Sequence, residues 1–185
     1  MAHIQLPAGL PGITGLLAVS PETARPLRAL AEVLLHGPNS LTPGERELIA
    51  AGVSAQNDCR FCALSHGAAA AANLDVSYDW VRGVQANVAT AAISEKLKSL
   101  LDIAGKVAQD GKLVAAEDVA RARAAGASDR EIHDTVLIAA AFCMYNRYVD
   151  GLATWQPEDP DDYREMGVHM AREGYAPRDA PSGAR

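Results

Sequence analysis

The sequence predicts an all-α protein, a single-domain multi-helix bundle of roughly six to eight helices. Helix-start residues followed by an apolar stripe at helical spacing recur along the chain, whereas the alternating pattern of strands is scarce. The composition agrees, since 49% of residues are hydrophobic, many of these are alanines, and only 5% are aromatic. Small side chains favour closely packed helices. The length of 185 residues suits one hydrophobic core.

The N-terminal segment, residues 1–20, is expected to be irregular because proline and glycine recur in it. A first helix should begin at Pro21, with Ser20 as its N-cap residue and proline at the first helical position. Its leucine and alanine stripe ends before Gly37 and Pro38, which are typical of a helix end.

A second helix should begin after Thr42, where Glu45 completes a capping box. The pair Asn57-Asp58 is expected to break this helix and to cap the next one. That next helix should run from Cys59 to about Asn73.

Further helices are predicted over residues 79–87, 94–109 and about 116–125. A second capping box at Ser128 opens a long helix that extends toward Trp155. We therefore assign residues 21–156 to one all-α domain. Residues 157–185 should form an acidic linker, a short C-terminal helix from Asp162 to Glu173, and a flexible tail rich in Gly, Pro and Arg.

The strongest chemical signal is the string Glu47-x11-Cys59-x2-Cys62-x3-His66. Two cysteines three positions apart on a helix rise by about 4.5 Å, which lies inside the usual Cα–Cα window for a disulfide. His66 lies one turn beyond Cys62, where it can exchange a proton with that thiol. An antiparallel return of the preceding helix would bring Glu47 to His66 and orient the imidazole as a base. The string therefore indicates a redox centre.

Each thiol has its own source of activation. Cys59 is expected in the first helical turn, where the helix dipole and Arg60 favour a thiolate and Asp58 opposes it. Cys62 lies deeper in the helix and has His66 as its base.

Two other interpretations of the string remain. Two cysteines, a histidine and a glutamate are zinc ligands, but Cys59 and His66 on one unbroken helix lie about 10 Å apart along its axis. The helix would have to unwind to let them share a metal, and the sequence gives no sign of that before Gly67. Alternatively, the cysteines and the histidine are buried core residues, and Glu47 only stabilises the start of its helix.

Composition also limits the class of partner. A net charge of −6 argues against general binding to nucleic acid or to anionic membranes. No apolar stretch is long enough for a membrane span, and we expect no secretory signal in the Pro- and Gly-broken N-terminus. Three cysteines are not typical of a secreted disulfide framework, so a cytoplasmic location is expected.

The segment GERELIAAGVSAQNDCRFCALSHGAAA resembles the core of the alkylhydroperoxidase D / carboxymuconolactone decarboxylase superfamily, specifically its redox branch. The resemblance extends over most of residues 8–155. LPGITGLLAVSPETARPLRALAEVLL and FCMYNRYVDGL are similar to the subgroup called peroxidase-related enzymes. Some members carry a second histidine between the two cysteines, where this chain has Arg60 and Phe61, so a relay role for that histidine does not transfer.

The resemblance implies an alkylhydroperoxidase D-like fold in which the second cysteine attacks peroxide and the first resolves it. Cys62 is therefore the favoured peroxidatic cysteine and Cys59 the favoured resolving one, with His66 and Glu47 as a proton relay. The resemblance also implies a dithiol reductant protein or a lipoyl-type donor and a homo-oligomer. We expect no metal and no cofactor.

Other residues have weaker signals. Cys143 is expected to be an inert core thiol. Asn146, Arg147 and Asp150 are similar to the subgroup's late motif, and they either line the pocket or an interface or form a polar face of their helix.

The function that we predict is a thiol-dependent peroxidase that reduces alkyl hydroperoxides. One alternative keeps the fold and is a decarboxylase of a small lactone acid, although the non-redox branch generally lacks the cysteine pair. The other is a non-enzymatic redox-sensing oligomer, because a sensor needs the same reactive thiol.

Overall fold

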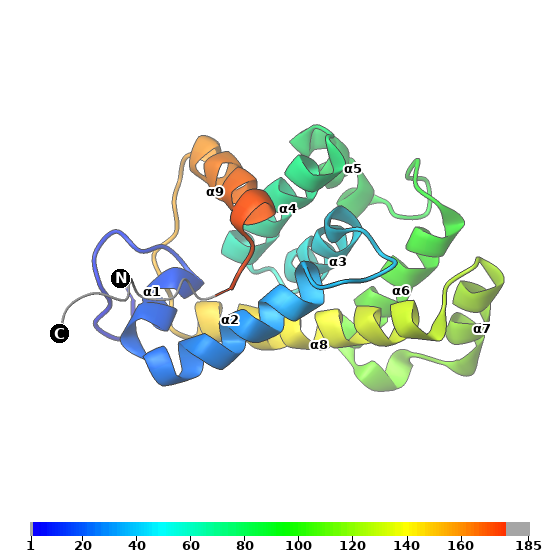
Figure 1. Cartoon of the computed structure of the whole chain (residues 1–185), viewed down its shortest axis with the longest axis horizontal. Coiled ribbons are helices and arrows are strands. Elements are labelled where there is room, and N and C mark those ends of the chain that lie inside the picture. The colour runs from blue at the N-terminus through cyan, green and yellow to red at the C-terminus, as the bar shows by residue number, and fades with distance from the viewer. Residues whose placement is uncertain (1, 177–185) are drawn as a thin grey trace.

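The computed structural model describes residues 2–176. The chain between these limits is helical and contains no strand, which confirms the predicted all-α class (Figure 1). The elements are α1 (Ile13–Val19), α2 (Pro21–Leu35), α3 (Pro43–Gln56), α4 (Arg60–Leu74), α5 (Tyr78–Ala86), α6 (Glu95–Gln109), a 3-10 turn η1 (Gly111–Leu113), α7 (Ala116–Ala124), α8 (Asp129–Gly151) and α9 (Pro160–Glu173).

Two of the predicted helix starts are confirmed, and at each a polar side chain accepts a hydrogen bond from a backbone N–H that the helix leaves unpaired. Thr42 and Glu45 form the expected capping box at the start of α3, and Ser128 and Glu131 form the one at the start of α8. α8 ends at Gly151, before Trp155.

The expectation of an irregular N-terminus is wrong for residues 13–19, which form α1. Proline and glycine do break the chain before it, and Gly12 adopts a φ of 53° where α1 begins. A side chain at Gly12 would collide with the ring of Phe61 on α4. Gly12 therefore allows a short helix to pack closely against α4, where the sequence pattern indicated only disruption.

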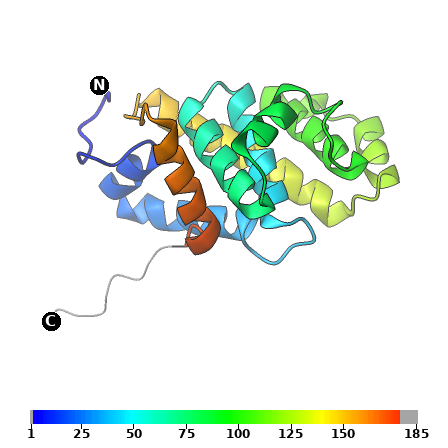
Figure 2. The ribbon, with the colours of Figure 1, turned by 90° about the horizontal axis from the view of Figure 1, so that it is seen from above.

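The long helix α8 runs along the lower side of the view in Figure 1, α2 crosses obliquely in front of it, and α3 and α4 pack against each other above (Figure 1). α6 and α7 lie at the far end, and α9 lies alongside α4, as the view from above shows (Figure 2). The main core is built from leucine, isoleucine, valine and alanine side chains between α2, α3, α4, α6 and α8.

The alanine-rich face of α4 is covered by the chain's own last helix. Gly167 of α9 sits directly on the backbone of Ala68, where an added Cβ would come within 2.5 Å of that residue. The C-terminal helix that the sequence predicted is therefore part of the helical body. The predicted flexible tail begins at Gly174, but residues 174–176 pack against the helical body, and residues 177–185 lie outside the described residues. Among the helices of residues 2–176, none is long and apolar enough to cross a membrane.

Candidate active site

Antiparallel packing of α3 and α4 brings Glu47 and His66 together. His66 Nδ1 lies 2.7 Å from Glu47 Oε2, and the Glu47 side chain is fully buried. Because the carboxylate accepts at Nδ1, the other ring nitrogen of His66 is left for proton exchange. The proximity expected from the sequence is confirmed.

The electrostatics of this pair favour a charged imidazole. Burial disfavours the imidazolium, but the charge of Glu47 and its hydrogen bond outweigh that effect and raise the pKa of His66. The Cys62 sulfur adds to the same shift.

The two cysteines lie beside each other in different local environments. Cys59 is the N-cap residue of α4 rather than a member of its first turn, and α4 begins at Arg60. Cys59 is fully buried and Cys62 is 3% exposed. Both are free thiols.

Their mutual hydrogen bond separates the two thiols in acidity. The Cys59 S–H donates to the Cys62 sulfur, which raises the pKa of Cys59 and lowers the pKa of Cys62. Burial raises both values, but at Cys62 the charge of His66 and a hydrogen bond from Asn146 act with Cys59 to keep the pKa low. Cys62 is therefore the thiol that ionises first.

Several expectations about the flanks of the pair are wrong. Asp58 has a φ of 58° in the turn before α4 and makes no cap on that helix. The Arg60 guanidinium donates to the Pro157 carbonyl and to the Tyr163 hydroxyl, so it ties α4 to the segment before α9. The arginine was expected to favour the Cys59 thiolate, whereas its guanidinium is engaged by Pro157 and Tyr163.

Asn146, Arg147 and Asp150, the late motif of the sequence, lie on two different faces of α8. Asn146 is buried, accepts from Asn57, donates to the Ser54 hydroxyl and faces Cys62. Asp150 hydrogen-bonds with Cys59. Arg147 instead caps the carbonyl of Cys143 on the exposed side of α8. Asn146 and Asp150 therefore line the thiol site and Arg147 does not.

Cys143 is half-buried outside the pair. Its sulfur lies 3.5 Å from Asn57 Nδ2 and 3.9 Å from the Ala108 carbonyl, and it makes no contact with Cys59 or Cys62 that would suit exchange. Cys143 packs against the main core, and its inertness stays a prediction.

One member of the site was missed. Tyr175, just after α9, donates its hydroxyl to Glu47 Oε1 at 2.5 Å and stacks on the ring of His66. The segment Gly174–Ala176 had been assigned to a flexible tail because it is short and rich in helix breakers. A single tyrosine there gives no periodic signal, so only the packing of α9 on α4 places it.

A cavity of about 300 Å³ opens onto Cys62 and His66. It is lined mainly by apolar side chains from α1, α2, α8 and α9, and these include Leu17, Leu27, Phe142, Met166 and Met170. Cys62 lines the cavity, whereas Cys59 lies behind it. A small apolar molecule entering there would reach Cys62 first.

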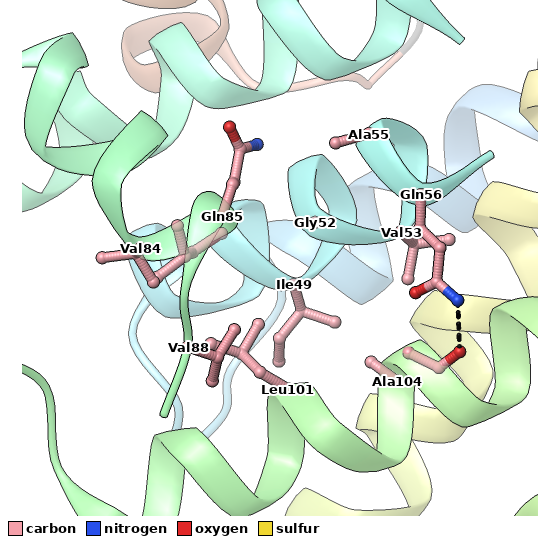
Figure 3. Close-up of a pocket in the computed structure, with 12 residues that line it drawn as sticks. Ile49, Gly52, Val53, Ala55, Gln56, Val84, Gln85, Val88, Leu101 and Ala104 are labelled. Carbon is pink, nitrogen blue, oxygen red and sulfur yellow. Dashed lines mark hydrogen bonds between the residues drawn. The ribbon is translucent and has the colours of Figure 1, made fainter. Parts of the chain in front are cut away.

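A second cavity, of about 330 Å³, lies between α3, α5 and α6 (Figure 3). Its lining is apolar except for Gln56, which donates to the Gly105 carbonyl, and Gln85. It contains none of the predicted site residues, whereas Cys62 and His66 line the first cavity. Within residues 2–176, no group of three or more His, Cys, Asp and Glu side chains is arranged to hold a metal ion.

Comparison with known proteins places this site in a family. The model of the carboxymuconolactone decarboxylase family matches residues 21–106, which include the whole Glu-Cys-Cys-His string. No curated protein sequence matches the chain significantly.

Solved structures share the fold. An alkylhydroperoxidase AhpD core, an uncharacterized peroxidase-related protein from Ralstonia eutropha JMP134, is 28% identical with a TM-score of 0.76, over 85% of this chain and 81% of that one. An uncharacterized peroxidase-related protein from Silicibacter sp. TM1040 is 24% identical with a TM-score of 0.71, over 90% and 95%. A protein from Agrobacterium tumefaciens described as a putative antioxidant defence protein AhpD is 22% identical with a TM-score of 0.67, over 86% and 100%. The family match over residues 21–106 and the shared fold together support the assignment of the chain to the alkylhydroperoxidase D / carboxymuconolactone decarboxylase superfamily.

Proposed function

We propose that the protein is a thiol-dependent peroxidase that reduces organic hydroperoxides. One observation supports this most: Cys62, the more acidic thiol, faces an apolar cavity beside His66, and a second thiol stands in hydrogen-bonding contact behind it. A peroxidatic cysteine needs both a base and a resolving partner.

The reaction begins with proton transfer from Cys62 to His66, whose positive charge Glu47 stabilises. The Cys62 thiolate attacks the distal oxygen of the hydroperoxide and the O–O bond breaks. Cys62 becomes a sulfenic acid, and the leaving alkoxide takes a proton from the His66 imidazolium and departs as an alcohol. The Cys59 thiol then attacks the Cys62 sulfur, which forms the disulfide and releases water.

Turnover requires an external dithiol. The donor reduces the Cys59–Cys62 disulfide to two thiols and becomes a disulfide itself. Because Cys59 is fully buried and the cavity reaches only Cys62, a slender lipoyl-type arm fits this step better than a broad protein surface. A cytoplasmic location and a homo-oligomeric assembly belong to the same proposal, and a monomer of 19.5 kDa in sedimentation would contradict the assembly.

The test is a titration of free thiols before and after one equivalent of an organic hydroperoxide. The wild type should lose two thiols and regain them with a dithiol donor. Cys62→Ser should not consume peroxide. Cys59→Ser should react once and stop at a sulfenic acid that a dimedone-type probe captures. Consumption at the wild-type rate by Cys62→Ser would refute the mechanism.

The family match also favours a second candidate, a decarboxylase of a small lactone acid. Such a reaction uses no thiol pair and leaves both thiols free during turnover. Release of carbon dioxide from a lactone acid by the double Cys→Ser variant would support this candidate. A redox sensor would form the disulfide with peroxide but would show no turnover with any dithiol donor.

A further inference from the structure

The Glu47 carboxylate lies between two imidazoles. His66 Nδ1 is 2.7 Å from Oε2, and His36 Nε2 is 3.9 Å from Oε1. The His36 nitrogen is buried and, within the described residues, has no hydrogen-bond partner. A buried donor of this kind gains from a carboxylate that turns toward it. His36 is therefore a competitor for the group that supports His66.

Tyr175 occupies the oxygen for which His36 would compete. Its hydroxyl donates to Glu47 Oε1 at 2.5 Å and lies 3.3 Å from His66 Nδ1. Its ring stacks on His66 at 5.8 Å between centroids and meets His36 edge to face at 5.5 Å. With this hydroxyl in place, both oxygens of Glu47 are engaged and Oε2 stays on His66.

The backbone on either side of Tyr175 is anchored to α2. Glu32 Oε2 accepts from the N–H of Tyr175 at 2.6 Å and from the N–H of Ala176 at 3.0 Å. Gly174 has a φ of 67°, and a Cβ there would meet Glu32 Oε2 at 2.5 Å. A glycine is thus required for the chain to leave α9 and cross over Glu32 into the site.

We propose that Tyr175 is a positioning residue of the relay, which holds the Glu47 carboxylate on His66 and prevents it from turning to His36, and that Glu32 holds Tyr175 in place. The inference rests on the proposed relay from Glu47 through His66 to Cys62. It assigns a role to the C-terminal segment that the sequence pattern did not indicate.

Several titratable groups face this cluster, and each element contributes. α2 and the turn after it supply Glu32 and His36, and α3 supplies Arg46, whose charge interacts with Glu47 while its guanidinium donates to the Leu34 carbonyl. The remaining titratable or polar neighbours are His66 and Cys62 from α4 and Tyr145, Asn146 and Asp150 from α8. Among these, Tyr175 and the two histidines are the groups within reach of the carboxylate oxygens.

The test measures the Cys62 thiolate by its ultraviolet absorbance and by its alkylation rate as a function of pH. In Tyr175→Phe the ring remains and only the donor is lost, so Glu47 turns toward His36 and His66 loses part of its support. The Cys62 titration should move to more alkaline pH, and alkylation at neutral pH should slow about fivefold, the size expected for one hydrogen bond. His36→Phe alone should leave the titration in place.

The double variant Tyr175→Phe/His36→Phe separates positioning from a structural role. Removing the competitor should return the titration toward that of the wild type. Tyr78→Phe, which removes a tyrosine hydroxyl packed on α4 near Gly67 but away from Glu47, should not move it.

Two results would overturn the inference: an unshifted titration in Tyr175→Phe, or a double variant as alkaline-shifted as the single one. None of these measurements uses peroxide. Failure of the protein to turn over hydroperoxide would therefore refute the proposed function without deciding the role of Tyr175.

Discussion

Replacement of Glu47 by glutamine tests the electrostatic basis of the site most directly. The substitution keeps the shape of the side chain and removes its charge. Glu47 is fully buried, and its oxygens accept from His66 and Tyr175. The glutamine amide has one acceptor for these two donors, and its NH₂ group faces one of them.

The expected loss of thiolate stabilisation in Glu47→Gln can be estimated from these hydrogen bonds. A hydrogen bond to a charged group contributes about 1.5–3 kcal/mol. The charge of Glu47 raises the pKa of His66, and the charged His66 in turn lowers the pKa of Cys62. If about half of this hydrogen-bond energy is transmitted, the Cys62 thiolate loses about 0.75–1.5 kcal/mol of stabilisation, which is a roughly four- to thirteenfold loss of reactivity at neutral pH.

The difference in reactivity between Glu47→Gln and the wild type depends on pH. Without the carboxylate the pKa of His66 falls and the pKa of Cys62 rises. Below both the old and the new Cys62 value, the variant holds less thiolate than the wild type and reacts more slowly. Above both values the two proteins hold the same thiolate and should react alike. The profile should therefore shift to alkaline pH with an unchanged plateau.

The assay is single-turnover reaction with an organic hydroperoxide, measured across pH beside alkylation of the thiol. Glu45→Gln is the matched control, because it lies on the same helix and bonds the backbone N–H of Thr42. Because glutamine can also complete a capping box, this variant should change stability little and leave the profile in place. An identical profile for Glu47→Gln and the wild type would refute the reasoning, as would a greater loss than that of His66→Ala.

Three further outcomes are expected. Asn146→Ala should raise the pKa of Cys62, because it removes a hydrogen-bond donor to that thiol, and the rate of alkylation as a function of pH measures this shift. The same substitution should lower the free energy of unfolding by about 1–3 kcal/mol, as measured by urea unfolding, because it leaves the buried partners of Asn146 unpaired. Gly167→Ala should lower the free energy of unfolding by about 1–3 kcal/mol, since its Cβ would meet the α4 backbone, whereas Gly83→Ala, in open space on α5, should raise it slightly. Stability should also fall as the pH drops from 4.5 to about 2. Burial disfavours the charged Glu131 carboxylate, but its hydrogen bonds outweigh burial and hold its pKa in the folded protein at about 2. Glu131→Gln should therefore flatten this part of the curve of stability against pH.

Each of these three can fail in a definite way. An unmoved thiol titration in the Asn146 variant would show that the amide does not stabilise the thiolate. Equal stability changes at the two glycines would show that the α9–α4 approach is looser than the structure indicates. A stability curve that keeps its acid limb in the Glu131 variant would assign that limb to other carboxylates.

The helices could be predicted because their signals are local. The capping boxes at Thr42 and Ser128 and the apolar stripes that follow depend on residues within one or two turns, and the structure has helices there. The pairing of Glu47 with His66 could also be predicted, because two consecutive helices joined by a short turn return antiparallel. The short helix α1 was missed since Gly12, its N-cap residue, serves tertiary packing against Phe61.

The helical class, the cysteine pair and the histidine nearest to it could thus be inferred from local sequence. The groups that surround the two cysteines and the histidine are known only from the packing of the helices. That packing placed Asn146 and Asp150 at the thiols but Arg147 outside, it turned Arg60 toward Pro157, and it brought Tyr175 over Glu47. Apart from the bond of Arg147 within its own helix, these contacts join residues 84 to 128 positions apart in the sequence, and no local spacing encodes such separations because they depend on how whole helices pack.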